Sequence, residues 1–561
     1  MRRLRWQILV VAITLIVVAV LLLSQQPALA PALSRPSSGG IYTEGLIGSL
    51  GRLNPLLDWN NPADRDVDSL VFSGLIKFDS RGLPQPDLAE SWGATPDGTV
   101  YNFTIRSNAV WQDGTPVTSD DVIFTIDLIK SSSFFPQDIK DLWNQITVTK
   151  LDDENLKFTL PEPFAPFLDY LTFGILPKHI LASAPAGQLA SANFNISPVG
   201  SGPYKFDHFV VESGYVAGVV LTLSDNYYGQ KPYIQQVVFR YYPDSKSAYD
   251  AFKQGEVLGV GQLSSDVLPE ALADPNLMVY TTSLPQMSIV LLNLNNSQVT
   301  FFQDANIRRA LMMGLNRDYI ISAFLKGEGI VADGPILPGS WAHYDGIEHI
   351  DYDPDAAVSL LEQEGYVIPS SGGAVRSKNS QALVFTFLYP QDTLHAQIAK
   401  AIQQDWAQIG VQANIQGVSY DQLISNSLAP RSYQAALVDL NLARTPDPDP
   451  YPFWHQSEAT GGQNYSQWNN RAASEYLEQA RTETDFTDRA RLYRNFQVVF
   501  AQDLPSLPLY YPVYNYGVSS QVQGVQIPMP MYDTSDRLAF IADWYLVTRR
   551  TIEQTPVPIA P

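Results

Sequence analysis

Within the segment from Leu88 to Leu128, apolar and polar residues alternate with a period of two over residues 101–106. After an Asp-Gly turn pair, Tyr101, Phe103 and Ile105 alternate with polar residues, which is typical of a half-buried strand. A second Asp-Gly pair follows this strand after a tryptophan. The pattern therefore predicts a strand bounded by a tight turn on each side.

A capped helix is predicted directly after this strand. Thr118 stands three residues before Asp121, so its hydroxyl can accept a hydrogen bond from an N-terminal amide, while the carboxylate favours the positive end of the helix. Val122, Ile126 and Ile129 then recur at helical spacing and form the face that the helix buries.

Strands and helices alternate after Met287, in the manner of βαβ units. Residues 289–294 form an apolar strand, and residues 304–326 are predicted as one helix. Asp353 caps a further helix with Pro354 in its first turn. We see no internal repeat at solenoid periods, so the sequence predicts a mixed α/β protein. The later elements are predicted from Leu383, Phe385 and Phe387 (strand), from Ala399, Ile402, Trp406 and Ile409 (helix), and from Val411, Ala413 and Ile415 (strand).

Several motifs in these segments follow one another in the order found in a known family. AESW, the strand and W-x-DGTPVTSDDV lie within residues 88–128, and SPVGSGPYKF begins at Ser197. IRRALMMGLNRDYII, YDPDAAVSLLEQEGY, DPDPYPFWHQS and NYSQWNN then follow in order between Ile307 and Asn470. From about Gly39 to about Asp543 the chain resembles the extracellular solute-binding proteins, family 5, of the peptide, dipeptide and nickel ABC importers.

This resemblance implies an α/β, two-lobed periplasmic-binding-protein-like fold with an extra subdomain inserted in lobe one, the cluster C type. The chain would cross between the lobes twice, near Leu284 to Asn295 and near Leu504 to Asn515, and these crossings are the expected hinge. Composition indicates a linker at 31–38 and a flexible tail at 546–561. The remaining expected domains are 39–70 with 198–285 and 505–545 as lobe one, 71–197 as the inserted subdomain, and 286–504 as lobe two.

Composition limits the classes of function for this chain of 561 residues. The formal net charge of −21 argues against nucleic acid, because a phosphate-binding surface needs a basic stripe. The acidity either favours cationic solutes or reflects only a well-hydrated surface. The absence of cysteine excludes disulfides, thiol catalysis and the lipid-anchoring cysteine of many members of the resembled family.

The N-terminal segment is predicted to direct export. Three arginines precede an apolar run from Ile8 to Leu23, and small residues follow at Ala28, Ala30 and Ala32. Residues 1–30 are therefore either a cleaved signal peptide or an uncleaved N-terminal membrane anchor. Both readings place the body of the protein outside the cytoplasm, in the periplasm or on the outer face of the cytoplasmic membrane.

Motifs of enzymes are missing from the sequence, including the Walker loop, the nucleophile elbow and the HExxH zinc motif. The six histidines are scattered, so no metal and no cofactor are expected. Asp447 and Asp449 alternate with prolines, which predicts a rigid loop and not a calcium-binding loop. We therefore expect no enzymatic activity.

The candidate ligand-binding residues come from the resemblance. In the peptide-binding members, an aspartate shortly before the DPD motif pairs with the peptide amino terminus, and an aromatic residue stands before it. Aligned on Asp447, these positions are Arg444 and Asn441, with Leu442 between them. A guanidinium prefers carboxylates or phosphates, so Arg444 either meets an anionic group of the ligand or forms a salt bridge within the protein. The other candidates are Ile47, Gly48, Ser49 and Leu50 at the end of the first strand. Trp341, Trp454, Asn464 and Tyr465 stand where the resembled family has cleft residues, and each of these four is equally compatible with the core.

The sequence thus predicts a monomeric receptor that captures a peptide or similar small polar solute by lobe closure. It would deliver this solute to an ABC permease and ATPase complex in the membrane. Within the same fold, an oligosaccharide or an anionic metabolite is the alternative ligand. From other classes, a secreted hydrolase or lyase that uses paired carboxylates and a sensor subunit for signalling remain alternatives.

Overall fold

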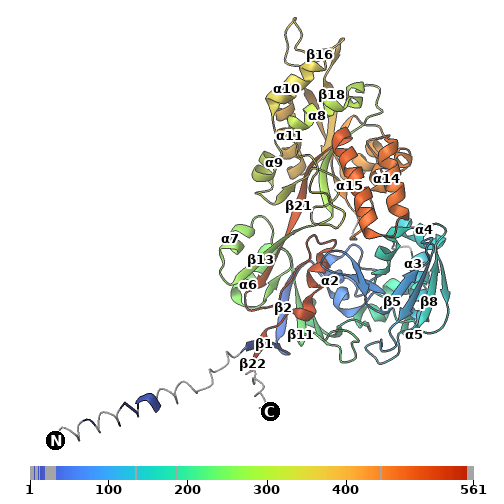
Figure 1. Ribbon diagram of the computed structural model, residues 1–561, viewed down its shortest axis with the longest axis vertical. Helices are drawn as coiled ribbons and strands as arrows, with labels where there is room; N and C mark the ends of the chain where they lie inside the picture. Colours follow the sequence, from blue (N-terminus) through green and yellow to red (C-terminus); the bar gives the residue numbers. More distant parts are fainter. Residues whose placement is uncertain are drawn as a thin grey trace.

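The computed structural model describes Trp6, Val11, Ile13, Thr14, residues 16–18, and residues 33–551 except 133–134, 184–185 and 443–444. Figure 1 shows an upper body and two lower bodies that lie side by side. We refer to the upper body, with α8 to α11, α14 and α15, as lobe two. The lower body with β2, β11, β13, α6 and α7 is lobe one, and the lower body with β5, β8, α3 and α4 is the inserted subdomain.

One sheet of 12 strands, counted over the described residues, runs through both lobes. The long strand β21 (Ser506–Ser519) belongs to both of them. Its first part pairs with β14 (Gln286–Leu292), and its second part pairs with β13 (Leu277–Ser283). The strand is buried except at Pro512 and Val513, which are half-buried where the chain passes from one lobe to the other.

Lobe one is a layer of strands with helices packed against it. The strand β2 lies between β11 and β12 and runs parallel to both. Tyr42 and Leu46 of β2 and Val237 and Phe239 of β11 are buried in its core. The elements of this lobe are β2 (Ile41–Ile47), β9 (Tyr204–Glu212), β10 (Tyr215–Leu223), β11 (Gln236–Tyr242), β12 (Gly259–Val260), α2 (Pro62–Val71), α6 (Ser245–Gln254) and α7 (Leu268–Ala273).

A buried ion network fastens the C-terminal part of the chain to lobe one. Arg537, in the short helix η7 (Thr534–Leu538), pairs with Glu44 of β2 at 2.6 Å and with Asp66 of α2 at 2.7 Å. The hydroxyl of Tyr516 donates a hydrogen bond of 2.6 Å to Glu44. Because these charged side chains are buried, removing any one of them would leave another buried charge without its partner.

Lobe two has helices on both faces of its sheet. In β14, Val290 and Leu292 face one hydrophobic core, while Ile289 and Leu291 face the other. This two-sided burial explains why the strand is a continuous apolar run in the sequence. The first core is covered by α8 (Ala305–Met313), α9 (Arg317–Phe324), α10 (Pro354–Gln363) and α11 (Thr393–Gln408), and the second by α14 (Arg471–Thr482) and α15 (Phe486–Asp503). The other elements are β15 (Gly329–Val331), β16 (Ser377–Lys378), β17 (Gln381–Ala382), β18 (Val384–Pro390), β19 (Gln412–Val418), β20 (Ala435–Asn441), α12 (Tyr420–Gln422) and α13 (Tyr451–Trp454).

The inserted subdomain contains the strand and helix that the sequence predicts most clearly, and both predictions are confirmed. Tyr101, Phe103 and Ile105 are buried on one face of β6, and Thr118 with Asp121 forms a capping box at the start of α3. The four-stranded antiparallel sheet has the order β5-β6-β8-β7. Its elements are β5 (Ala89–Ala94), β6 (Val100–Ile105), β7 (Thr147–Lys150), β8 (Asn155–Thr159), α3 (Ser119–Ser131) and α4 (Gln137–Gln145), with β3 (Ile76–Phe78), β4 (Pro84–Pro86) and α5 (Lys178–Leu181) beside it.

The prediction of one helix over residues 304–326 is wrong, because the structure has two helices there. Helix α8 ends at Met313, and the side chain of Asn316 accepts a hydrogen bond from the amide of Tyr319 at the start of α9. An asparagine at this position competes with the helix for backbone amides and begins a new helix.

The segments expected to be a linker and a flexible tail each contain a strand. Strand β1 (Leu33–Ser37) pairs antiparallel with β22 (Val547–Thr551) at the base of lobe one. The sequence pattern missed both strands because a pair formed from the two ends of a chain has no local turn to mark it.

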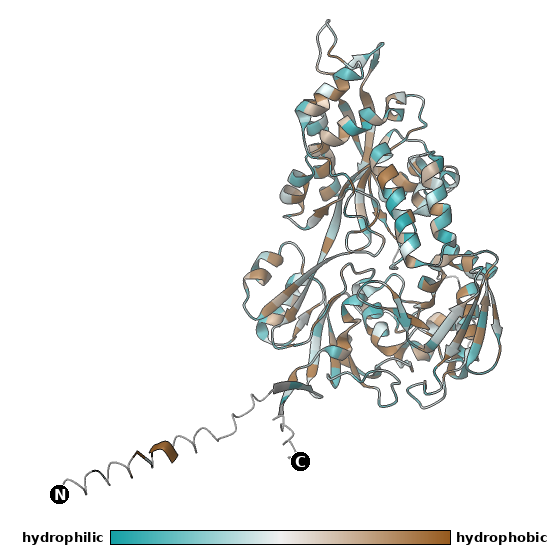
Figure 2. Cartoon of the chain, viewed as in Figure 1, coloured by the Kyte–Doolittle hydropathy of each residue, from teal (hydrophilic) through white to brown (hydrophobic). Residues whose placement is uncertain are grey.

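Figure 2 shows hydrophilic residues on the visible side of α14 and α15, and it shows described residues of the N-terminal segment in the hydrophobic colour. Among the helices that the structure describes, none is long and apolar enough to cross a membrane. The described residues also contain no group of three or more His, Cys, Asp or Glu side chains placed to hold a metal ion.

Candidate ligand-binding site

The loop that follows β20 connects lobe two with the inserted subdomain. The backbone amide of Asp447 donates a hydrogen bond of 2.7 Å to Oδ2 of Asp169 in the inserted subdomain. The carboxylate of Asp447 accepts a hydrogen bond of 3.1 Å from the hydroxyl of Tyr493 and pairs with the guanidinium of Arg489, both on α15. Asp447 therefore holds the loop between the two bodies, through its backbone amide on one side and its buried carboxylate on the other.

A second ion pair holds the same loop against α14. Arg481 donates two hydrogen bonds to the carboxylate of Asp449, at 2.9 and 2.7 Å. Its guanidinium also lies 3.7 Å from the ring centroid of Tyr451. A forked pair of this kind fixes the direction as well as the distance of its partner, so the loop has two rigid attachments.

Burial shapes the electrostatics of the contact between Asp169 and Asp447. Burial, and next the charge of Asp447, raises the pKa of Asp169 to about 8. Burial also raises the pKa of Asp447, although the charge of Arg489 opposes this effect. Near pH 7 Asp169 is therefore mainly uncharged, while Arg489 neutralises Asp447.

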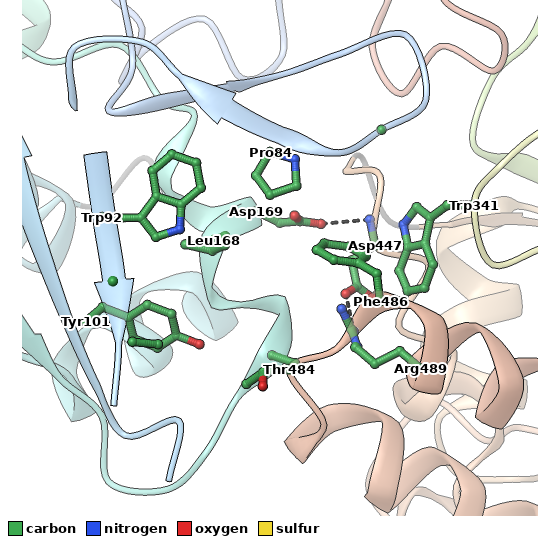
Figure 3. Close-up of a pocket in the computed structure, with 14 residues that line it drawn as sticks. Pro84, Trp92, Tyr101, Leu168, Asp169, Trp341, Asp447, Thr484, Phe486 and Arg489 are labelled. Atoms are coloured by element: carbon green, nitrogen blue, oxygen red, sulfur yellow. Dashed lines mark hydrogen bonds and ion pairs between the residues drawn. The ribbon is translucent and has the colours of Figure 1, made fainter. Parts of the chain in front are cut away.

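A cavity of about 280 Å³ lies beside this contact, between the inserted subdomain and lobe two (Figure 3). The inserted subdomain supplies Trp92 and Tyr101, and lobe two supplies Trp341 and Phe486. Arg489 and the two aspartates complete the lining. A second, much smaller cavity of about 20 Å³ is lined by Leu442 and Tyr532 together with prolines of the same loop.

A cluster of three polar residues, His395, Asp392 and Asp439, lies at the end of the lobe-two sheet that faces lobe one. His395 bonds to Asp392 at 2.6 Å and to Asp439 at 3.1 Å, and Asp439 is partly exposed. Burial lowers the pKa of His395, but the two carboxylates outweigh this effect and raise it above its ordinary value. Sequence reasoning missed this group. Its signal is present in the sequence, because β18 and β20 are parallel and polar residues at their carboxyl ends must meet.

The candidates at the end of the first strand lie at the surface of lobe one. Gly48 and Ser49 are exposed, while Ile47 and Leu50 are half-buried. Gly48 has a φ of +125°, and its amide donates to the carbonyl oxygen of Tyr242 at 2.9 Å. Because β2 is an interior strand, only its last residues are accessible for pairing with a ligand backbone.

The candidates of lobe two fall into two groups. Trp341 and Asp447 come together at the larger cavity, where Nε1 of Trp341 donates to the carbonyl oxygen of Pro446 at 2.9 Å. Asn441 is exposed and accepts from Gln286 at 3.1 Å, while Leu442 is half-buried. Arg444 lies outside the described residues.

Two candidates, Trp454 and Asn464, are buried in lobe two, which agrees with the core alternative that the sequence left open for them. Trp454 is 2% exposed and packs edge-on against Phe500 at 4.8 Å. Asn464 is 0% exposed, and its amide group makes three hydrogen bonds to the backbone of His455 and Trp468. The ring of Trp454 therefore serves to pack the core. The amide of Asn464 serves to fix the backbone of the loop, and all of its hydrogen bonds are to that backbone. Tyr465 is half-buried, and the guanidinium of Arg431 lies 4.8 Å from the centroid of the Tyr465 ring.

Comparisons with known proteins agree with this architecture. The oligopeptide-binding protein AppA of Bacillus subtilis is 27% identical over 519 residues, which cover 91% of this chain and 92% of that protein. The solved structure of AppA in complex with a nonapeptide matches with a TM-score of 0.65 at 26% identity, over 91% of this chain and 100% of that one. The dipeptide-binding protein of Escherichia coli is 26% identical over 510 residues, which cover 85% of this chain and 90% of that protein.

The fold is also shared with CtaP, an ABC transporter substrate binding protein of Listeria monocytogenes. That structure matches with a TM-score of 0.71 at 24% identity, over 91% of this chain and 100% of that one. These matches confirm the expected two-lobed α/β fold. The profile of the bacterial extracellular solute-binding proteins, family 5 Middle, matches residues 84–463. Because this match spans more than half of the chain, the protein belongs to the bacterial extracellular solute-binding proteins of family 5.

Proposed function

We propose that this protein is the extracytoplasmic receptor of an ABC importer and that it captures a peptide or a similar small polar solute. It acts as a monomer, breaks no bond, and passes its solute to a permease and ATPase complex. The relatives support this proposal, since they include an oligopeptide-binding and a dipeptide-binding protein over nearly the same length. We also propose that the lobes and the inserted subdomain have the residue limits that the sequence predicts.

The observation that carries the proposal is the single strand shared by two separately packed lobes. The core of lobe one and the two cores of lobe two contain different residues, yet β21 runs through both bodies. Such a pair of bodies can rotate about the crossing segments while each core stays intact. Closure then depends only on a solute that binds the closed state more tightly than the open state.

We place the solute between the end of β2 and the lobe-two residues that follow β20. On the lobe-one side, the exposed backbone of Gly48 and Ser49 offers polar groups to an extended chain. On the lobe-two side, Asp439 supplies a negative charge, and from its sequence position we propose that Arg444 meets an anionic group of the solute. Charges of opposite sign suit a zwitterionic solute such as a short peptide.

The test has two stages. Native mass spectrometry of protein purified from its host identifies the retained solute, and calorimetry then measures its affinity for the protein stripped of ligand. Asp439→Asn should weaken binding about tenfold or more, because a charge-assisted hydrogen bond is lost. Asp225→Asn is the control, since the Asp225 side chain is 88% exposed in lobe one. A protein that neither retains a solute nor binds peptides of two to nine residues would refute the proposal.

A further inference from the structure

The larger cavity is bordered by Asp447 of the loop that follows β20, but it is distinct from the end of β2 and from Asp439, where we place the solute. It lies between the β5–β6 hairpin of the inserted subdomain and the start of α15 in lobe two (Figure 3). Neither the end of β2 nor Asn441 lines it. The cavity therefore needs an explanation of its own.

Two hydrogen-bond donors in the cavity have no partner among the described residues. Tyr101 is only 4% exposed, and its hydroxyl makes no hydrogen bond to any residue that the structure describes. Figure 3 shows this hydroxyl pointing into the cavity. Within the same described part of the chain, Nε1 of Trp92 is also unpaired. Because both residues line the cavity, each can donate a hydrogen bond to an acceptor that is placed there.

Aromatic rings form the walls on both sides. Trp92 and Tyr101 face Trp341 and Phe486 across the cavity (Figure 3). Rings prefer to stack or to meet edge to face at centroid distances of about 4.5–7 Å, so a flat group between these walls would contact both bodies. The cavity volume of about 280 Å³ is close to the lower limit of roughly 300 Å³ for small-molecule sites, which indicates a single ring with a small substituent.

The charges at the floor of the cavity cancel. Arg489 neutralises Asp447, and the raised pKa of Asp169, about 8, keeps that carboxyl largely protonated near pH 7. A charged ligand would have to leave water without gaining an unpaired partner of opposite sign. The floor thus favours an uncharged ligand.

We propose that this cavity is a second binding site, which takes an uncharged aromatic group carrying a hydrogen-bond acceptor and bridges the inserted subdomain to lobe two. The rings of Trp92 and Trp341 enclose the aromatic group, and the hydroxyl of Tyr101 donates to its acceptor. The site goes beyond the capture of the main solute and does not depend on which solute that is.

Three probes of nearly equal shape test the charge preference: benzamide, benzamidinium and benzoate. Titrations monitored by NMR at pH 6.5 should show benzamide binding in the millimolar range that is expected of a small fragment. The two charged probes should bind at least about tenfold more weakly. Equal binding of all three probes, or no binding of benzamide, would overturn the proposal.

Matched variants test the position. Tyr101→Phe keeps the ring and removes the donor, so benzamide should bind about threefold to tenfold more weakly. Tyr215→Phe is its control, because Tyr215 is 79% exposed on lobe one and should leave binding unchanged. Unchanged affinity in Tyr101→Phe would contradict the assigned donor.

A second pair of variants uses the alternation of side chains in the β5–β6 hairpin. Ala94 pairs with Tyr101 and faces the same side, whereas Asn102 of β6 faces the opposite side, is exposed and does not line the cavity. Ala94→Leu should abolish benzamide binding, and Asn102→Leu should preserve it. Both variants should retain their melting temperature and their affinity for the main solute, which separates failure of this site from failure of the receptor function. Full benzamide binding by a folded Ala94→Leu variant would overturn the proposal.

Discussion

The carboxylate of Asp447 and the guanidinium of Arg489 form an ion pair whose side chains are 4% and 3% exposed. Removing one partner leaves the other charge buried without compensation. Arg489→Ala should therefore lower the free energy of unfolding by about 3–5 kcal/mol. Arg491→Ala on the same helix is the control, because its pair with Asp488 is largely exposed and should contribute at most about 1 kcal/mol. Equal melting temperatures for the two variants would show that the Asp447 loop is not held by this pair.

The buried carboxyl of Asp169 predicts a pH dependence of stability. Its pKa is raised from 3.8 to about 8, so the folded protein binds this proton more tightly than the unfolded chain does. The resulting stability is fully present below about pH 4 and is lost as the pH rises towards 8. Asp169→Asn retains an acceptor for the amide of Asp447 and cannot ionise. The melting temperature of this variant should thus fall less between pH 6 and 9 than that of the wild type, and parallel curves would contradict the assignment.

The sequence was sufficient to predict those strands and helices whose pattern lies within the element itself. The alternation around Phe103 and the cap at Thr118 are local, and the structure has both as expected. It was insufficient where the signal is spread along the chain. The contact of Asp169 with Asp447 joins positions 278 residues apart, and the pairing of β1 with β22 joins the two ends of the chain. The burial of Trp454 could not be inferred from its sequence neighbours, because a tryptophan suits a cleft and a core equally well.

The assignment of Trp454 and Asn464 to the core predicts a loss of stability without a loss of affinity. Trp454→Ala should destabilise the protein by about 3–5 kcal/mol through the cavity that it leaves. Asn464→Ala should cost about 1–3 kcal/mol for each backbone group left without a partner. Calorimetry at a temperature where both variants remain folded should find the affinity for the retained solute unchanged. A large drop in affinity in a variant of undiminished stability would return that residue to the binding site.

The N-terminal segment predicts the location of the protein in the cell. Residues 8–23 form the long apolar run behind three arginines, and no cysteine is present for lipid attachment. Deletion of residues 1–23 should leave the protein in the cytoplasm, because the export signal is lost. Cell fractionation with immunodetection measures this directly. Export of the truncated protein at the wild-type level would show that another segment carries the signal.

Capture by lobe closure is the central claim, and small-angle X-ray scattering tests it most directly. The protein is stripped of ligand and measured alone and after saturation with a peptide whose binding calorimetry has established. Rotation of the lobes about the segments between β13 and β14 and within β21 should reduce the radius of gyration in the saturated sample. An unchanged scattering profile at full saturation would contradict capture by closure.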